Sequence, residues 1–515
     1  MARTPLASIL LKSYMSAGTK MEKQLNTGQV ITLDLHHMQN VDYTPQMSLI
    51  VSGQPAPRIV IVGAGLAGLT CAYRLRQAGI LSTIYEASER VGGRCWTRRG
   101  YFKENQMVER GGELIDTCHK EIQNLAKELG LELDNLIMAE PVETKPFYFF
   151  GQQPYTFDEV TNDFMKILPK LQKDLEEVGE TTLYNRFTER GWELDQMSIV
   201  DYINETVPDG IHSRFGKLLA LAYTVEFGAD AYEQSALNLL YLLAYAQNEP
   251  FRMYGDSDEC FHIKGGNDQL PTLLANKLQG QIKLNFQLIK IEQMAQKQIR
   301  LVFRKKEVEW EVLADKVILA LPFSILRTID YENAGFCLLK QTAIEELGMG
   351  VNTKMHAQFV NRFWNELGNN GESFADTGYQ QTFESTRAQP GHSGILVNFT
   401  GGETAANQFA FTDHKLEETT KEFLDKLEPV LPGSMNNWNG LATVDHWLSN
   451  QWTKGAYSYW KVGQYTKFAG ILGEREGKIF FAGEHTSIKY QGYLNGAVET
   501  GERAAQEVIN DMIIN

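Results

Sequence analysis

The sequence predicts an α/β protein built around a Rossmann-type dinucleotide-binding domain that is assembled from discontinuous segments. An apolar run of strand length, 58–62, is followed by a glycine-rich turn, a segment of helical period, 66–78, and a second short strand, 82–85. This order is that of a βαβ unit. The stretch 119–261 is mainly helical and amphipathic, and strand-like runs return at 282–286, 301–303 and 317–320. We therefore expect a helical insertion and a mixed-sheet substrate domain beside the dinucleotide-binding domain.

The expected domain boundaries follow these changes of pattern. Residues 1–57 show no sustained period and end in Gly53-Gln-Pro-Ala-Pro57, which is typical of an extension joined by a linker. Segments 58–118, 262–330 and 441–515 are assigned to the dinucleotide-binding domain. The helical insertion is expected over 119–261 and the substrate-binding domain over 331–440.

Composition narrows the classes of partner. The 515 residues carry a formal net charge of −15, which disfavours nucleic acid and anionic membrane as partners. The sequence has no window near the ~18 consecutive apolar residues that span a bilayer. Its five cysteines are scattered without metal-ligand spacing, and the pair His36-His37 is expected to be solvated, so no metal site is predicted. A cytoplasmic location is expected, with secretion left open.

The sharpest motif is the glycine turn that follows the first strand. Gly63 permits the tight turn, Gly65 lets the backbone approach a pyrophosphate, and Gly68 allows close packing of helix on strand. The following helix N-terminus offers N–H groups to phosphate. Glu86 ends the second strand, at the spacing expected for a carboxylate that binds ribose hydroxyls. Dinucleotide binding is therefore the leading interpretation of this segment.

A second glycine motif, Glu89-Arg-Val-Gly-Gly-Arg94, lies just beyond the second strand. Its backbone at Gly93 and the guanidinium of Arg94 would both suit the same diphosphate. A nicotinamide-binding domain has no need of this second loop. A glycine turn with a surface arginine is the alternative for the hexamer taken alone.

With these motifs the chain resembles the flavin-containing amine oxidases, a family that includes monoamine oxidases, polyamine oxidases and L-amino-acid oxidases. The resemblance spans roughly residues 58 to 513. The matching segments are Val60–Gly68, Glu86, Val91–Arg94, Arg110–Glu113, Lys264–Leu270, Phe481–Thr486 and Gly492–Gly501. It implies an FAD-binding domain of the glutathione-reductase-like type.

The resemblance also implies which residues surround the cofactor. Monoamine oxidases attach their flavin through a cysteine, and Ala456 stands at that position here, so we expect noncovalent FAD. Glu484 and its neighbours are expected beside the ribityl chain, and Gly112 to Leu114 beside the isoalloxazine. The expected cofactor-binding residues are Gly63, Gly65, Gly68, Glu86, Gly93, Arg94, Gly112, Glu113, Leu114, Trp452, Gly483, Glu484 and Leu494.

Three residues are expected to act in catalysis. The resemblance places Lys354 where the family keeps a lysine linked through water to flavin N5, and it places Tyr457 and Tyr493 on opposite sides of the substrate amine. Two aromatic faces would steer the amine and tolerate its cationic form. A solvated strand lysine and two core tyrosines are the structural alternatives.

The expected reaction is hydride transfer from an amino-bearing carbon to flavin N5, with O2 as acceptor. The N-terminal extension and helical insertion favour an L-amino-acid oxidase, which is the leading interpretation, and the tyrosine pair favours the alternative, a monoamine or polyamine oxidase that forms an aldehyde. Arg110 and Glu113 are candidate substrate contacts, although the sequence does not say where Arg110 points. A homodimer is expected. A dehydrogenase of another substrate and a noncatalytic flavoprotein are the alternative classes.

Overall fold

The computed structural model describes residues 21–24, 30–33, 56–244, 251–295, 298–407 and 413–514. The chain divides into two units, Met1–Ala56 and Pro57–Asn515. In the first unit, β1 (Met21–Gln24) and β2 (Val30–Leu33) form an antiparallel pair. The pair His36-His37 lies outside the described residues. All other elements belong to the second unit.

A parallel five-stranded sheet forms the centre of the dinucleotide-binding domain. Its order is β11 (Ile282–Leu284), β4 (Ser82–Glu86), β3 (Ile59–Val62), β15 (Lys316–Leu319) and β23 (Ile479–Phe481). The strands β3, β15 and β23 are fully buried, as their continuous apolar runs require. The sheet thus collects strands separated by some hundreds of residues, as the discontinuous Rossmann-type architecture predicts.

Two further sheets complete the β structure. An antiparallel sheet joins β12 (Gln287–Gln293), β13 (Ile299–Lys305) and β14 (Val308–Ala314). A mixed seven-stranded sheet carries the predicted substrate domain. Its strands, in order, are β21 (Trp438–His446), β17 (Asn352–Phe359), β20 (Gly394–Gly401), β19 (Gln380–Glu384), β18 (Asn369–Ala375), β8 (Lys145–Phe149) and β9 (Pro154–Tyr155).

The predicted domain boundaries differ from this sheet at two places. Strands β8 and β9 come from the stretch assigned to the helical insertion, and β21 crosses the boundary placed at residue 440. Sequence periodicity identifies a strand but not its hydrogen-bonding partner, which lies far away in the chain. The seven-stranded sheet therefore begins before residue 331 and extends to His446.

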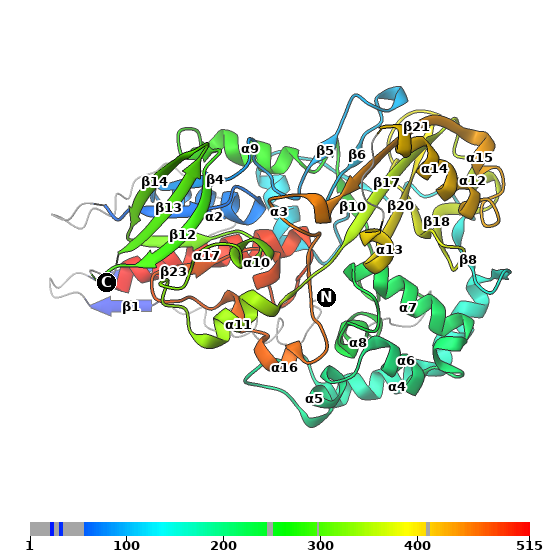
Figure 1. Ribbon diagram of the computed structural model, residues 1–515, viewed down its shortest axis with the longest axis horizontal. Coiled ribbons are helices and arrows are strands. Elements are labelled where there is room, and N and C mark those ends of the chain that lie inside the picture. Colours follow the sequence, from blue (N-terminus) through cyan, green and yellow to red (C-terminus); the bar gives the residue numbers. More distant parts are fainter. Residues whose placement is uncertain are drawn as a thin grey trace. The chain divides into compact units, whose positions relative to one another are not determined.

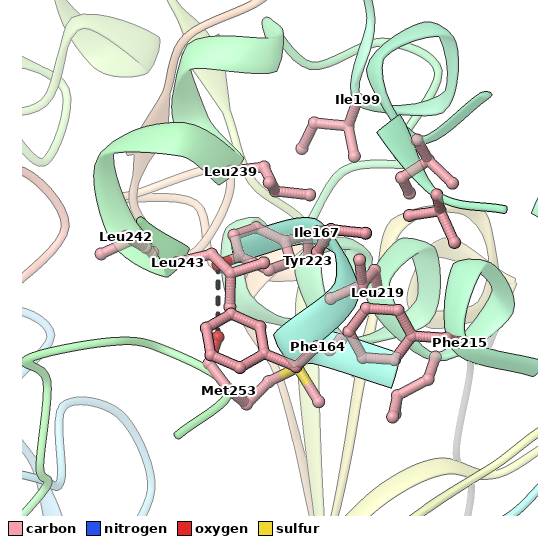
Figure 2. Packing of buried hydrophobic residues seen from close by; sticks show 14 of the residues in the cluster. Phe164, Ile167, Ile199, Phe215, Leu219, Tyr223, Leu239, Leu242, Leu243 and Met253 are labelled. Atoms are coloured by element: carbon pink, nitrogen blue, oxygen red, sulfur yellow. Dashed lines mark hydrogen bonds between the residues drawn. The ribbon is translucent and has the colours of Figure 1, made fainter. Parts of the chain in front are cut away.

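The helical insertion shares one hydrophobic core with strands β8, β9 and β18. It comprises α4 (Phe157–Val178), α5 (Glu189–Asp195), α6 (Ile199–Thr206), α7 (Arg214–Phe227) and α8 (Ala236–Leu243). Figure 2 shows Phe164, Leu219 and Leu243 packed together, with the Tyr223 hydroxyl donating to the carbonyl of Met253 at 3.2 Å. Helix α7 packs on β18, β19 and β20, below that sheet in the view of Figure 1. The core thereby holds the end of α7 and the segment after Met253 against the substrate sheet.

The remaining helices connect these sheets. They are α3 (Lys120–Glu128), α9 (Gln269–Lys277), α10 (Phe323–Leu326), α11 (Leu338–Glu346), α12 (Phe363–Glu366), α13 (Gly402–Ala406), α14 (Asp413–Leu427), α15 (Ser434–Asn437) and α16 (Gln464–Phe468). Short strand pairs join β5 (Thr97–Arg98) with β6 (Val108–Glu109), β7 (Leu133–Asn135) with β10 (Phe261–Ile263), and β16 (Gly348–Met349) with β22 (Ser458–Tyr459). No helix in the described part of the chain is long and apolar enough to cross a bilayer.

Two glycines bring α2 (Leu66–Gln77) unusually close to its neighbours. A Cβ on Gly68 would lie 2.1 Å from the Gly63 carbonyl oxygen, and one on Gly501 would lie 2.5 Å from the Ala67 carbonyl oxygen. Gly501 belongs to α17 (Leu494–Ile514), which packs along α2. Since no other residue fits at such distances, α2 is clamped between the glycine turn and α17.

Candidate active site

The first glycine turn has the geometry of a phosphate cradle. Gly63 adopts φ +103°, and a Cβ there would meet the Ala320 carbonyl oxygen at 2.6 Å. Gly65 has an extended backbone, and a Cβ on it would meet nothing within 4 Å. The Glu86 carboxylate accepts from the Ala64 N–H at 2.7 Å and from the Ser88 N–H at 2.8 Å. The hydrogen bonds to Glu86 therefore fix the turn, and the space beside the Gly65 Cα is open.

The second glycine loop lies directly beside the first. The Gly92 N–H donates to the Ala64 carbonyl at 2.8 Å, and a Cβ on Gly93 would lie 3.5 Å from the Gly65 Cα. Arg94 follows, but its Nη1 donates to the Ala456 carbonyl and to Glu484, both at 2.8 Å. The loop is thus where the sequence predicts it, while this guanidinium nitrogen is directed to protein acceptors.

Glu484 ties three distant segments together. It accepts from Arg94, from the Ser458 hydroxyl at 2.8 Å and from the Gly492 N–H at 2.8 Å. Burial favours its neutral form, but the Arg94 guanidinium and these hydrogen bonds outweigh burial, so the pKa of Glu484 lies below its ordinary value. A permanent carboxylate therefore holds the Gly492 backbone next to Tyr493.

Lys354 lies on β17 and is 6% exposed. Its Nζ donates to the Gly111 carbonyl at 2.8 Å and to the Glu113 carboxylate at 2.6 Å. The other Glu113 oxygen accepts from the Ser385 hydroxyl at 2.7 Å. Asn267 holds the same segment through the carbonyls of Gly112 and Glu113. The lysine is therefore a buried ion-pair partner, and the solvated-strand alternative is wrong.

Tyr457 and Tyr493 converge on one residue of the helical insertion, Glu226. The Tyr457 hydroxyl donates to the Glu226 carbonyl at 2.6 Å, and the Tyr493 hydroxyl lies 3.4 Å from the Glu226 carboxylate. Tyr493 is also 3.4 Å from the Ser257 hydroxyl. Both rings are half-buried. Both residues therefore keep some exposed surface, which a fully packed core tyrosine does not.

Arg110 does not point toward the tyrosines. Its guanidinium forms an ion pair with Asp445 and stacks on Trp96, with 3.3 Å from its Cζ to the ring centroid. Arg98 binds the same Asp445 carboxylate. Arg110 is therefore engaged by protein groups, and its role as a candidate substrate contact stays a prediction. The direction of this side chain depends on Asp445, 335 residues later.

Of the remaining predicted cofactor residues, Gly112, Leu494 and Gly483 make defined packing contacts, whereas Leu114 and Trp452 are described by their burial alone. Leu494 packs against Gly112, where an added Cβ would meet its side chain at 2.6 Å. Gly483 adopts φ +132° and donates its N–H to Thr500 at 3.0 Å. Leu114 and Trp452 are both half-buried, and Trp452 lies beside the turn that precedes Tyr457. These contacts give Gly112, Leu494 and Gly483 packing roles.

Glu226, at the end of α7, was not predicted from the sequence, although its carboxylate lies 3.4 Å from the Tyr493 hydroxyl. No motif marks it. The run Thr224-Val-Glu-Phe-Gly228 shows an acidic residue two positions before a helix-ending glycine, which is the only local signal.

Asp116, Cys118 and His119 form the one group of metal-capable side chains found among the described residues. The Asp116 carboxylate accepts from the Ser257 hydroxyl at 2.7 Å and from the Glu259 N–H at 3.1 Å. The His119 ring packs on Tyr493, with 4.8 Å between centroids. These contacts assign Asp116 a structural role, which is to hold the segment that carries Ser257 and Glu259.

The open space beside the glycine turn fits a flavin dinucleotide. The helix N-terminus at Leu66 and the backbone of Gly65 and Gly93 border the open space in front of the turn. From there the Arg94–Glu484 pair leads to Gly112, Lys354 and the tyrosines. Fold and site together are those expected of a nucleotide-binding enzyme.

Comparison with known proteins identifies the family. The family model for flavin containing amine oxidoreductase matches residues 66–509, so the chain belongs to this family. The predicted family and the α/β fold class are thereby confirmed, as is a flavin-dependent enzyme of amines or amino acids.

The relatives include two kinds of oxidase. The chain is 26% identical over 471 residues to amine oxidase [flavin-containing] B of Cavia porcellus, covering 88% of this chain and 86% of that protein. It is 24% identical over 508 residues to an L-amino-acid oxidase of Siganus canaliculatus, covering 93% and 91%. Among solved structures, cyclohexylamine oxidase from Brevibacterium oxydans aligns with a TM-score of 0.76 at 21% identity, covering 89% of this chain and all of that one. A variant of putrescine oxidase gives a TM-score of 0.76 at 22% identity, covering 88% and 99%.

The two central glycines should respond differently to a larger side chain. Gly65→Val places its side chain in open space, so the protein should fold but lose its flavin absorbance. Gly68→Val drives a Cβ into the Gly63 carbonyl and should lower the yield of folded protein. Flavin content and circular dichroism of both purified variants make the comparison. Full flavin occupancy in Gly65→Val would contradict the assignment of this cradle.

Proposed function

We propose that the chain is an oxidase with noncovalent FAD that oxidises an amino-bearing carbon. The Gly63–Gly68 turn and Gly93 would hold the diphosphate, Glu86 the ribose, and Glu484 with Gly112 to Leu114 the flavin half. Ala456 offers no thiol for a covalent bond. When bound, the flavin supplies the two-electron acceptor.

The convergence of Tyr457 and Tyr493 on Glu226 carries this proposal. Two half-buried rings held by their hydroxyl groups form a rigid support for an amine and limit the orientations of its C–H bond. Orientation of this kind is worth about 7–11 kcal/mol of barrier in well-oriented systems. Lys354, fixed by Gly111 and Glu113, supplies a positive charge and an N–H donor for an ordered water. Oxygen is the proposed final acceptor.

The structure shifts the balance between the two substrate classes. The sequence favours an L-amino acid because of the N-terminal extension and the helical insertion. An α-carboxylate needs a cation, ideally a bidentate arginine, and Arg110 is engaged with Asp445 and Trp96. The engagement of Arg110 favours an amine, and the L-amino acid is the second candidate.

Anaerobic flavin reduction by a panel of amines, L-amino acids and D-amino acids tests the proposal. Acid precipitation of the holoenzyme should first release the yellow chromophore into the supernatant. Aerobic turnover should then form ammonia and hydrogen peroxide together with an aldehyde from an amine, or with a 2-oxo acid from an L-amino acid. If no member of the panel reduced the flavin, the proposal would be wrong.

Removing the Lys354 ammonium should slow reoxidation more than substrate binding. Lys354→Met deletes the cation near the site where negative charge develops, and we expect at least a tenfold slower reaction with oxygen in stopped-flow. It also leaves Glu113 as an unpaired buried carboxylate, which destabilises the protein. The double variant Lys354→Met/Glu113→Gln removes that charge and serves as the control. Normal reoxidation in the double variant would exclude Lys354 from this role.

The two tyrosine hydroxyls should not be equivalent. Tyr457→Phe leaves the part-buried Glu226 carbonyl without its 2.6 Å donor, and the loss of a typical hydrogen bond costs about 1 kcal/mol. Tyr493→Phe removes only contacts of 3.4 Å. We therefore expect a larger fall of Tm and of the flavin reduction rate in Tyr457→Phe, and much larger losses of rate in the Ala variants. Equal behaviour of the two Phe variants would refute this ranking.

A further inference from the structure

A short hydrogen-bonded chain leads away from the Lys354 ammonium. Lys354 Nζ donates to one Glu113 oxygen at 2.6 Å, and the other Glu113 oxygen accepts from the Ser385 hydroxyl at 2.7 Å. Lys354 and Glu113 are buried, with 6% and 8% of their surface exposed, whereas Ser385 is half-buried. The chain therefore runs from the interior of the candidate active site toward the outside, through groups that can each donate or accept a proton.

Backbone hydrogen bonds hold Ser385 in place for this contact. Its N–H donates to the Ile395 carbonyl at 3.0 Å, and its carbonyl accepts from the Gln389 side-chain amide at 3.1 Å. The same amide group exchanges hydrogen bonds with the backbone N–H and carbonyl of Met107, both at 3.0 Å. Because Ser385 is fixed on both sides, the direction of its hydroxyl toward Glu113 is set by the fold of this loop.

A cavity of about 440 Å³ borders the same loop. Its lining includes Glu384, directly before Ser385, and Gln389, whose amide bonds to the Ser385 carbonyl. Two exposed residues of the loop, Ala388 and Pro390, also line it, so the cavity is open to solvent. A polar space of this size holds water. The cavity therefore places solvent beside the outer end of the chain.

The oxidation of an amine by oxygen needs a route for one proton. Conversion of the H–C–N–H group to C=N releases two electrons and two protons, and conversion of O2 to H2O2 takes up the same number. The hydride from carbon carries both electrons and one of the protons. The other proton leaves from the amine nitrogen, so the oxygen must draw its second proton from a protein group that water can recharge.

We propose that Ser385 and Glu113 are positioning residues that act through Lys354 and return to it the proton that it gives up toward oxygen. The O–H bond of Ser385 breaks as an O–H bond forms on Glu113, and water from the cavity restores the hydroxyl. Rotation of the protonated carboxyl group then presents the proton to the neutral Lys354 amine. One proton enters the chain for each proton that leaves it. The inference rests on the proposed oxidase function and adds to it the source of this proton.

Reoxidation of the chemically reduced holoenzyme tests the inference without any choice of substrate. The protein is reduced with one equivalent of dithionite and mixed with oxygenated, weakly buffered solution in a stopped-flow instrument. Flavin absorbance follows reoxidation, and a pH indicator dye follows proton uptake. We expect Ser385→Ala to slow both by about tenfold or more, because the outer O–H is gone. Imidazolium in the buffer should restore most of the rate, since a small acid that enters the cavity can donate in place of the hydroxyl.

Matched variants of the same loop separate proton supply from structural support. Ser385→Thr keeps the hydroxyl and should react like the wild type. Thr386→Val removes the neighbouring buried hydroxyl, which donates to Glu384 at 2.9 Å and lies outside the chain. This control should lower Tm yet leave reoxidation unchanged and insensitive to imidazolium. Ser385→Ala/Glu113→Gln should be no slower than Glu113→Gln alone, because both changes interrupt one route.

The outcomes distinguish this inference from the proposed function. If flavin-loaded Ser385→Ala reoxidises at the wild-type rate, or slows without recovery in imidazolium, the inference fails and the proposed oxidase function stands. Should Ser385→Ala lose its flavin, Ser385→Cys keeps the side-chain shape with a weaker donor, and the same two results decide there. If oxygen does not reoxidise the wild-type holoenzyme, both the inference and the proposed oxidase function are overturned.

Discussion

The close approach of α2 to the glycine turn and to α17 is the constraint on which the site depends. Gly68 admits the Gly63 carbonyl, and Gly501 admits the Ala67 carbonyl, at distances that exclude any Cβ. Because α17 begins at Leu494, directly after Tyr493, this clamp links the phosphate cradle to one wall of the candidate substrate site. Small residues here act through the backbone positions that they permit.

The charged interactions of the site serve mainly to join segments that are remote in sequence. Glu484 joins Arg94, Ser458 and the Gly492 backbone, and Lys354 joins β17 to the Gly111–Glu113 segment. Each of these carboxylates is buried and has a full set of partners, so its removal would leave another charge or donor unsatisfied. The geometry of the site is therefore maintained by mutual dependence among elements of all three parts of the second unit.

Local patterns predicted those features whose physics is local. The βαβ order, the roles of Gly63 and Gly68, and the position of Glu86 follow from spacing within about 30 residues. Long-range contacts were beyond such patterns. The direction of Arg110 depends on Asp445, Lys354 is paired with Glu113, and the contacts of Glu226 with Tyr457 and Tyr493 form only because the helical insertion folds onto the seven-stranded sheet. For the same reason β8, β9 and β21 were assigned to neighbouring domains.

The end of α7 has a consequence that does not involve any ionisable group. This helix stops at Gly228 in a left-handed conformation, and its last carbonyls accept from side chains: Val225 from Asn352 at 2.7 Å and Glu226 from Tyr457 at 2.6 Å. The C-terminal end of a helix carries roughly half a negative elementary charge from its aligned peptide dipoles. That partial charge cannot be protonated. A static field that attracts cations therefore persists beside the tyrosines even in acid, where the carboxylates become neutral.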